Sequence, residues 1–161
     1  MKPKPVYLEK GWRIGVGIVL LNNDKNIFLG KRIDNKGAWQ MPQGGVNVGS
    51  GEELYVAAKR ELYEETGVTS VTFLGESKEW YYYYLPKYLS SKLWKGKFIG
   101  QKQKWFALNF EGKDSEINIS SHKSPEFCNW DWVKPEYAKN KIIDFKKEIY
   151  KKVFEEFSCF I

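Results

Sequence analysis

Arg60-Glu-Leu-Tyr-Glu-Glu-Thr-Gly-Val68 places three glutamates on a little over one turn of a predicted helix. Glu61, Glu64 and Glu65 stand at i, i+3 and i+4, so their carboxylates project from one side of that helix. Like charges at this spacing repel one another, and the helix macrodipole already disfavours negative charge in the last turn. A sequence suited only to helix stability would carry lysine here. The cluster therefore indicates a site that holds a cation.

The ligand types indicate which cation this is. Carboxylates without His or Cys favour a hard divalent ion, Mg²⁺ or Mn²⁺, over zinc. Mg²⁺ commonly joins one or two carboxylates to substrate phosphates, so the cluster also predicts a phosphate-bearing substrate. His122 is the only histidine, which excludes a His-based triad. The alternative interpretation is a solvated acidic helix face, which is the usual explanation for a few isolated glutamates.

The residues before the cluster predict where its helix begins and how it is buried. Ser50 and Glu53 have the spacing of a capping box, in which two side chains satisfy the free N–H groups of the first turn. Gly67 stands where a left-handed residue ends a helix. The apolar positions recur at i, i+3, i+4 and i+8 and form one core-facing stripe: Leu54, Ala57, Ala58 and Leu62.

The rest of the chain predicts strands and one more helix. A β-branched strand at 14–21 is followed by a turn and a hairpin partner, and a Gly-rich loop or short strand covers 37–46. Apolar residues at helical spacing predict a second helix at 136–157. This order indicates a mixed α/β fold with a sheet between helices. The remaining predicted strands are 26–31, 71–76, 79–85, 98–110 and 129–133.

Length and composition limit the class of protein. The 161 residues predict a single domain, 1–161, whose first ten residues are loosely ordered. The formal charge of +6 favours anionic partners such as nucleotides, nucleic acid or phosphates. An aromatic content of 17% argues against disorder, and two cysteines cannot form a disulfide framework. No apolar stretch predicts a secretory signal or a membrane span, so we expect a cytoplasmic protein without a membrane partner.

A long segment without acidic residues lies between Glu79 and Glu111. Cationic groups for phosphates and aromatic faces for bases are the composition expected of a single-strand binding surface. The alternative is an exposed basic loop between two core strands, in which alternate aromatic residues are simply buried. The lysines of the segment are Lys87, Lys92, Lys95, Lys97, Lys102 and Lys104, interleaved with Trp, Tyr and Phe.

The glutamate cluster resembles the Nudix box, G-x5-E-x7-R-E-U-x-E-E-x-G-U, in which U is apolar. Glu52 matches its first glutamate and Gly44 its first glycine. The chain departs from the pattern because two extra residues separate these positions. We place them in Val48-Gly-Ser-Gly51, the turn before the helix, where insertions cost little.

Other segments resemble one branch of the Nudix family, the bacterial RNA pyrophosphohydrolases and related dinucleoside polyphosphate hydrolases. The resemblance runs from about Trp12 to Phe157. It departs at Ala38, a position that is often polar in this group. The segments are Trp39-Gln-Met-Pro-Gln-Gly-Gly45, Trp80 with Leu85-Pro86, Gly100-Gln-Lys-Gln-Lys-Trp-Phe106, Pro125-Glu-Phe127 with Trp130-x-Trp132, and Phe145-Lys146.

The resemblance implies an α/β/α sandwich and assigns roles residue by residue. It implies that Mg²⁺ or Mn²⁺ is bound by Glu61, Glu64, Glu65 and Glu126, with Gly45 as a further ligand and Arg60 in the catalytic set. Arg60 more often orients a neighbouring glutamate than touches substrate. Phe145 would help to hold a base. The residues implied to lie near the 5′ phosphates or the first nucleotide are Arg13, Arg32, Gln43, Tyr83, Gln101, Lys102 and Lys104.

The implied activity is hydrolysis of 5′-triphosphorylated RNA to 5′-monophosphate RNA and pyrophosphate by a monomer that promotes RNA decay. A metal-bound water would attack, with Glu61 or Glu126 as its base. The nearest alternative is the same chemistry on diadenosine polyphosphates. A non-catalytic RNA-binding module would have lost the carboxylates, and a general nucleotide-pool hydrolase would not need the long basic segment.

Overall fold

β1 (Trp12–Leu21) lies at the centre of a mixed sheet, and most of its side chains are buried. The computed structural model describes residues 5–35 and 37–161. β1 runs parallel to β7 (Gly100–Phe110) over its whole length and antiparallel to the short β4 (Gln43–Gly45). The other strands are β2 (Ile27–Arg32), β3 (Trp39–Gln40), β5 (Val71–Glu76), β6 (Tyr81–Tyr84) and β8 (Phe127–Val133).

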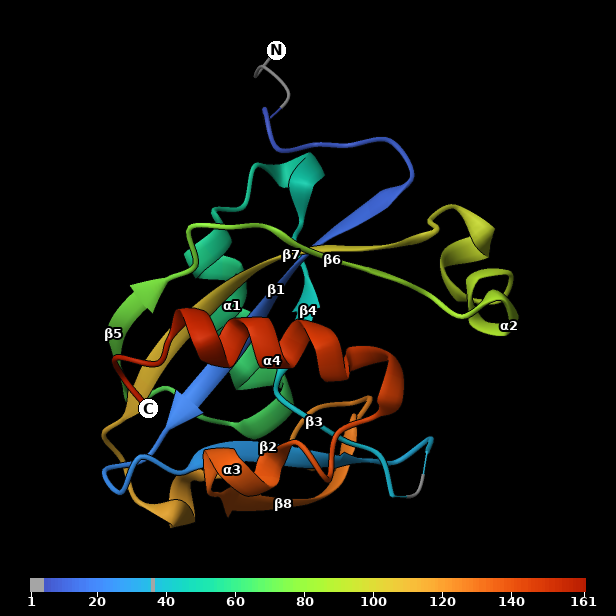
Figure 1. The fold of residues 1–161 in the computed structure, drawn as a ribbon. Helices are drawn as coiled ribbons and strands as arrows, with labels where there is room; N and C mark the ends of the chain where they lie inside the picture. Colours follow the sequence, from blue (N-terminus) through green and yellow to red (C-terminus); the bar gives the residue numbers. More distant parts are fainter. Residues whose placement is uncertain (1–4, 36) are drawn as a thin grey trace.

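Two helices cover opposite faces of this sheet (Figure 1). α1 (Leu54–Thr66) lies behind β1, and α4 (Lys147–Glu156) lies in front of it. Two further helices are short: α2 (Lys87–Ser90), and α3 (Pro135–Ala138), whose Ala138 is buried in the same core as α4. The short 3₁₀ helices are η1 (Val48–Ser50), η2 (Leu93–Gly96), η3 (Asp114–Glu116) and η4 (Asp144–Lys146).

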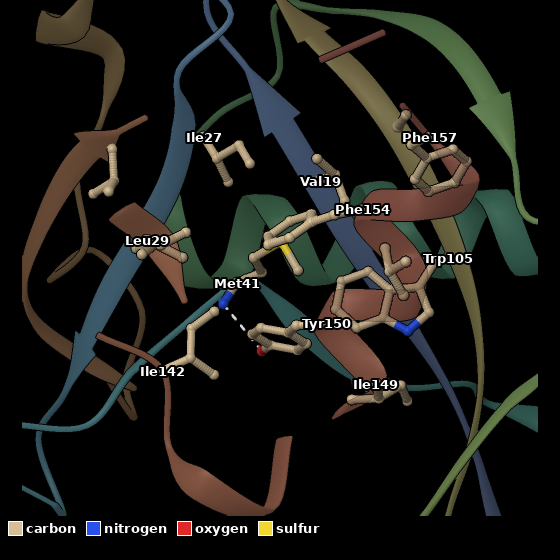
Figure 2. Close-up of a cluster of buried hydrophobic side chains, with 14 of the residues drawn as sticks. Val19, Ile27, Leu29, Met41, Trp105, Ile142, Ile149, Tyr150, Phe154 and Phe157 are labelled. Carbon is tan, nitrogen blue, oxygen red and sulfur yellow. Dashed lines mark hydrogen bonds between the residues drawn. The ribbon is translucent and has the colours of Figure 1, made fainter. Parts of the chain in front are cut away.

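Alternation along the central strands supplies a separate core to each helix. Ile18 and Leu20 of β1 pack in the cluster that contains Ala57 of α1. Val19 of β1 and Trp105 of β7 point the other way, into the cluster that contains α4 (Figure 2). The predicted sandwich, with a mixed sheet between helices, is therefore confirmed.

The second core contains a buried hydrogen bond that ties α4 to the loop between β3 and β4. The Met41 backbone N–H donates to the Tyr150 hydroxyl at 3.1 Å (Figure 2). We expect Tyr150→Phe to lower the free energy of unfolding by about 1–3 kcal/mol, because the Met41 N–H would be left buried without a partner. Denaturant titration measures this. Tyr137→Phe, at an exposed position, is the control; equal stability of Tyr150→Phe and the unchanged protein would contradict the prediction.

The start of α1 differs from the sequence prediction. Glu53 is the N-cap residue, and its side chain makes no capping hydrogen bond. Ser50 instead ends η1 and donates its hydroxyl to the Asn47 carbonyl at 3.0 Å. Gly51 adopts a left-handed φ of 75° between η1 and α1, which separates Ser50 from the first turn of the helix. The predicted capping box is wrong, whereas Gly67 ends α1 with the left-handed φ of 74° that was predicted.

The predicted helix at 136–157 is also wrong as one element. α3, η4 and α4 divide it, and a turn at 139–141 followed by the bridge residue Ile142 lies between α3 and η4. The connection pairs with β3, where Trp39 N–H donates to the Lys141 carbonyl at 3.2 Å and Trp39 bridges Ile142. Ile142 is buried in the core by this pairing, so its apolar character did not signal a helix. Tyr137, at the same apparent spacing, is exposed.

Tyr7 and Glu9, before the first strand, contact residues of the sheet. The Lys102 ammonium donates to the Tyr7 carbonyl at 2.7 Å, and the Tyr82 hydroxyl donates to Glu9 at 2.7 Å. The expectation of a loosely ordered start covers 1–10, of which 1–4 lie outside the described residues. Among the residues described, no helix combines the length and apolar character that crossing a bilayer requires.

Candidate active site

A polar cavity of about 490 Å³ lies where α1, β4 and β6 meet the segment that leads into α4. β4 is only three residues long, so glutamates of α1 reach past it to the side on which Tyr83 and Gln101 lie. Most of the predicted site residues line this cavity. They are Arg13, Arg32, Gln43, Gly45, Glu61, Glu64, Glu65, Tyr83, Gln101, Glu126 and Phe145.

The acidic wall of the cavity is strained electrostatically. Glu65 is buried, and its carboxylate accepts one hydrogen bond, from the Gln43 backbone N–H at 3.3 Å. Burial raises the pKa of Glu65 well above its usual value, and the nearby charges of Glu61 and Glu126 raise it further. Burial also raises the pKa of Glu61, although Arg60 opposes this. A bound cation would relieve this repulsion.

Glycines let the carboxylates approach the strand closely. A Cβ at Gly44 would overlap the carboxylate of Glu61, so only glycine leaves enough space for that side chain. A Cβ at Gly45 would overlap the guanidinium of Arg13 in the same way. Because β4 has glycine at these two adjacent positions, the side chains of Glu61 and Arg13 can both pack directly against its backbone.

Arg60 contacts the glutamates from outside the cavity and is not one of the residues that line it. It donates two hydrogen bonds to Glu52, from Nε at 2.7 Å and from Nη2 at 3.0 Å. Its Nη1 donates to Glu61 at 3.0 Å and to Glu64 at 3.3 Å, and its Nη2 donates to the Gly45 carbonyl at 2.8 Å. The structure thus gives Arg60 a positioning role, although the resemblance placed it in the catalytic set.

Two arginines form the cationic wall. The Arg13 guanidinium donates to Gln101 at 3.4 Å and lies 4.5 Å from the ring centroid of Trp94. Arg32 pairs with Asp34 through two hydrogen bonds of 2.8 and 2.6 Å. A guanidinium held as a planar fork suits phosphate oxygens. The cavity is therefore lined by both carboxylates and guanidinium groups.

Gln43, Tyr83 and Phe145 complete the cavity. Gln43 donates to the Tyr83 hydroxyl at 3.1 Å, while its own side-chain oxygen is buried without a hydrogen-bond partner in residues 5–35 and 37–161. Tyr83 is buried, which raises its pKa to about 12 and keeps its hydroxyl protonated. Its ring centroid lies 5.9 Å from that of Phe145. The orphaned Gln43 oxygen is an acceptor that a bound molecule could satisfy.

Lys146 and Trp94 were not assigned a role from the sequence. Lys146 is buried at the cavity and donates to Gln40 at 2.7 Å. Burial, together with the nearby charge of Arg32, lowers its pKa to about 7, although the charge of Glu65 opposes the change. The resemblance included Lys146 only as the neighbour of Phe145, and Trp94 resembles the other aromatic residues of the basic segment, so neither was predicted to line the site.

Lys102 and Lys104 lie away from the cavity. They alternate with Gln101 along β7, so their side chains leave the opposite face of the strand. Besides the bond to Tyr7, Lys102 forms an ion pair with Glu9 at 3.3 Å, and Lys104 donates to the Lys78 carbonyl at 3.1 Å. The structure therefore does not bring these predicted phosphate ligands to the carboxylates.

The donor set suits a hard cation, although no ready-made ligand cage is present. Across the described ranges, no three His, Cys, Asp or Glu side chains are gathered closely enough to hold a metal ion. Arg60 donates hydrogen bonds to Glu61 and Glu64, and the Gln43 N–H donates to Glu65. These bonds direct the three carboxylates toward different partners. Carboxylate oxygens around a buried, like-charged Glu65 are nevertheless the chemistry that Mg²⁺ or Mn²⁺ binds. The carboxylates fit such an ion once it replaces these hydrogen-bond donors.

A sheet held between two helices, with a glutamate-bearing helical turn at a polar cavity, defines the Nudix class of proteins. The NUDIX domain matches residues 11–155, and the chain belongs to this family. Nudix proteins generally depend on divalent metal ions.

Relatives cover nearly the whole chain. The RNA pyrophosphohydrolase of Wolbachia pipientis subsp. Culex pipiens (strain wPip) is 50% identical over 153 residues, 95% of this chain and 93% of the relative. The RNA pyrophosphohydrolase of Novosphingobium aromaticivorans is 47% identical over 150 residues, 91% of this chain and 92% of the relative.

Solved structures share the fold at lower identity. The MutT protein from Methanosarcina mazei Go1 superposes with a TM-score of 0.68 at 21% identity, covering 92% of this chain and 97% of that one. A C. elegans Ap4A hydrolase gives a TM-score of 0.64 at 20% identity, covering 91% of this chain and 98% of that one.

Proposed function

We propose that this protein is an RNA 5′-pyrophosphohydrolase. The observation that carries the proposal is the cavity, which is lined by Glu61, Glu64 and Glu65 together with Arg13 and Arg32 and is large enough for a nucleotide end. A triphosphorylated RNA end needs both kinds of side chain, because its phosphates require cationic groups and its hydrolysis requires carboxylates. Relatives that carry this name and are 43–50% identical over most of the chain support the assignment.

The residues divide the work as follows. Glu61, Glu64, Glu65 and Glu126 would hold Mg²⁺, or Mn²⁺ in its place, and the bound ions would offset phosphate charge and acidify water. Arg13 and Arg32 bind phosphate oxygens and orient the anhydride. Glu61 or Glu126 accepts the proton of the attacking water as pyrophosphate leaves and 5′-monophosphate RNA remains.

The 5′ nucleotide has aromatic surfaces to contact. Phe145 and Tyr83 lie together on one side of the cavity, and Trp94 lies with Arg13 on another. A base that stacks on Phe145 would leave the phosphates directed toward the arginines. The buried side-chain oxygen of Gln43, which has no hydrogen-bond partner among the residues that the structure describes, offers an acceptor to the bound nucleotide.

Two separate aromatic surfaces also suit a substrate with two bases. This observation favours a second candidate function, hydrolysis of diadenosine polyphosphates, with one base at Phe145 and the other at Trp94. A competition assay decides between the two candidates. We expect kcat/KM for triphosphorylated RNA to exceed that for diadenosine tetraphosphate, and the reverse order would favour the second candidate.

Labelled RNA tests the reaction directly. We expect RNA with a γ-labelled 5′-triphosphate to release labelled pyrophosphate when Mg²⁺ is present, while α-labelled RNA keeps its label. Chelation of the metal should stop the release, and Mn²⁺ added in place of Mg²⁺ measures the preference between the two ions. Intact RNA under all of these conditions would refute the proposed function.

A further inference from the structure

The structure divides the acid-free basic segment into two parts with different surroundings. Lys102 and Lys104 lie on β7, where the Tyr7 and Lys78 carbonyls accept their hydrogen bonds. The remaining lysines lie on a projection between β6 and β7, residues 86–99, here named the β6–β7 arm (Figure 1). The arm contains α2 and η2 and extends beyond the edge of the sheet.

The inner side of the β6–β7 arm forms part of the cavity. Leu89, Leu93 and Trp94 line the cavity together with Arg13. The backbone turns sharply here, because Trp94 has a left-handed φ of 49° and Lys95 one of 57°. Trp94 thereby faces Arg13 while the neighbouring Lys95 is exposed. A chain that leaves the cavity on this side would pass directly over the arm.

The outer side of the β6–β7 arm is positively charged. Lys92, Lys95 and Lys97 are exposed, and in the described parts of the chain none of the three has a carboxylate partner. No Asp or Glu occurs between Glu79 and Glu111 to offset them. Uncompensated lysines beside a phosphate-binding cavity form an electrostatic path for a polyanion.

Exposed aromatic rings accompany these lysines. Tyr88 on α2 is 66% exposed, and Tyr84 at the end of β6 is 68% exposed. Large apolar rings at the surface offer faces on which unpaired bases stack, which requires no particular base sequence. Charge and rings together match a single RNA strand better than they match an acidic protein surface, because stacking needs planar bases.

We propose that the β6–β7 arm binds the RNA chain downstream of the triphosphate-bearing nucleotide. Lys92, Lys95 and Lys97 contact backbone phosphates, and Tyr88 stacks on a base. This inference rests on the proposed function, and it deepens that function by making the single-stranded body of the RNA part of the substrate. The arm would favour RNA over mononucleotides and dinucleoside polyphosphates, which have no phosphates beyond the cavity.

A charge-neutralising variant tests the inference on substrates of two lengths. We expect the triple variant Lys92→Gln, Lys95→Gln, Lys97→Gln to lose about tenfold in kcat/KM for a triphosphorylated single-stranded 12-mer. Turnover of a triphosphorylated dinucleotide, which is too short to reach these three lysines, should stay unchanged. The matched control is Lys139→Gln, Lys151→Gln, Lys152→Gln, which removes the same charge from exposed positions elsewhere and should leave both substrates unaffected.

Binding without catalysis separates this inference from the proposed function. Fluorescence anisotropy with a 5′-hydroxyl 12-mer measures affinity against salt, and we expect the arm variant to flatten the log–log slope by about two. Tyr88→Ala should weaken the same complex by about tenfold. Equal slopes for arm variant, control and unchanged protein would overturn the inference. Failure of the unchanged protein to cleave either triphosphorylated RNA would instead refute the proposed function.

Discussion

Glu65→Gln is expected to lower kcat/KM for triphosphorylated RNA by about 10³-fold and to raise the melting temperature in chelator. The carboxylate of Glu65 is buried beside Glu61 and Glu126 and accepts one hydrogen bond, from Gln43. Glutamine keeps the shape but removes the charge that would bind the cation, which contributes several kcal/mol to the transition state. Without metal, the same substitution removes an unfavourable buried charge.

The pH dependence of stability follows from the raised pKa of Glu65. A carboxyl group whose pKa is higher in the folded protein than in the unfolded chain favours folding at low pH. That contribution is lost as the pH rises from the unfolded value of about 4.3 through the folded pKa. In chelator we therefore expect the melting temperature of the unchanged protein to fall over this range more steeply than that of Glu65→Gln.

The controls for Glu65→Gln separate charge from general damage. Glu155→Gln makes the same change at an exposed position near the far end of α4, away from the cavity, and should alter neither turnover nor stability. Added Mg²⁺ should raise the melting temperature of the unchanged protein more than that of Glu65→Gln. Unchanged turnover of Glu65→Gln, or a lower melting temperature in chelator at pH 8, would contradict the assignment of Glu65.

Gly44→Ala is expected to lower kcat by about 10²-fold with little change in stability. The new Cβ would overlap the carboxylate of Glu61, which is the far end of a flexible side chain, so Glu61 would rotate away while β4 keeps its place. A displacement of about 1 Å in a catalytic group costs on the order of 10² in rate. Steady-state kinetics and thermal unfolding measure the two effects separately.

Gly49→Ala is the matched control for Gly44→Ala. Gly49 lies in η1, shortly after β4, and a Cβ there would meet no atom within 4 Å. We expect this variant to retain full activity. Equal kcat for Gly44→Ala and Gly49→Ala would show that the close approach of Glu61 to β4 does not matter for the reaction.

Local sequence patterns predicted α1 well because the interactions that form it are local. Leu62 and its apolar partners recur at helical spacing, and Gly67 supplies the left-handed end. The capping box failed because η1 and Gly51 intervene between Ser50 and the helix. The predicted helix at 136–157 failed for a different reason. Ile142 is buried by pairing with Trp39, about a hundred positions earlier, and periodicity does not distinguish such a contact from a helical one.

In the candidate site, too, features set by local spacing were predicted, and features set by contacts between distant residues were not. The spacing of Glu61, Glu64 and Glu65 on one helix follows from the sequence, as does the chemistry of oxygen ligands. The alternation of Gln101 and Lys102 along β7 was also readable, but the sequence does not say which face of the strand meets the cavity. Lys102 and Lys104 were therefore predicted at the phosphates, although they lie on the opposite face.

By itself, the sequence determined the family and the acidic helix turn and predicted a bound divalent cation, because these depend on residue type and spacing along a single element. Tertiary structure alone decided that Arg60 supports the glutamates from behind, that Lys146 and Trp94 enter the cavity, and that the lysines divide between β7 and the β6–β7 arm. Such placements depend on how strands distant in sequence pair and cross, and no local pattern records that pairing.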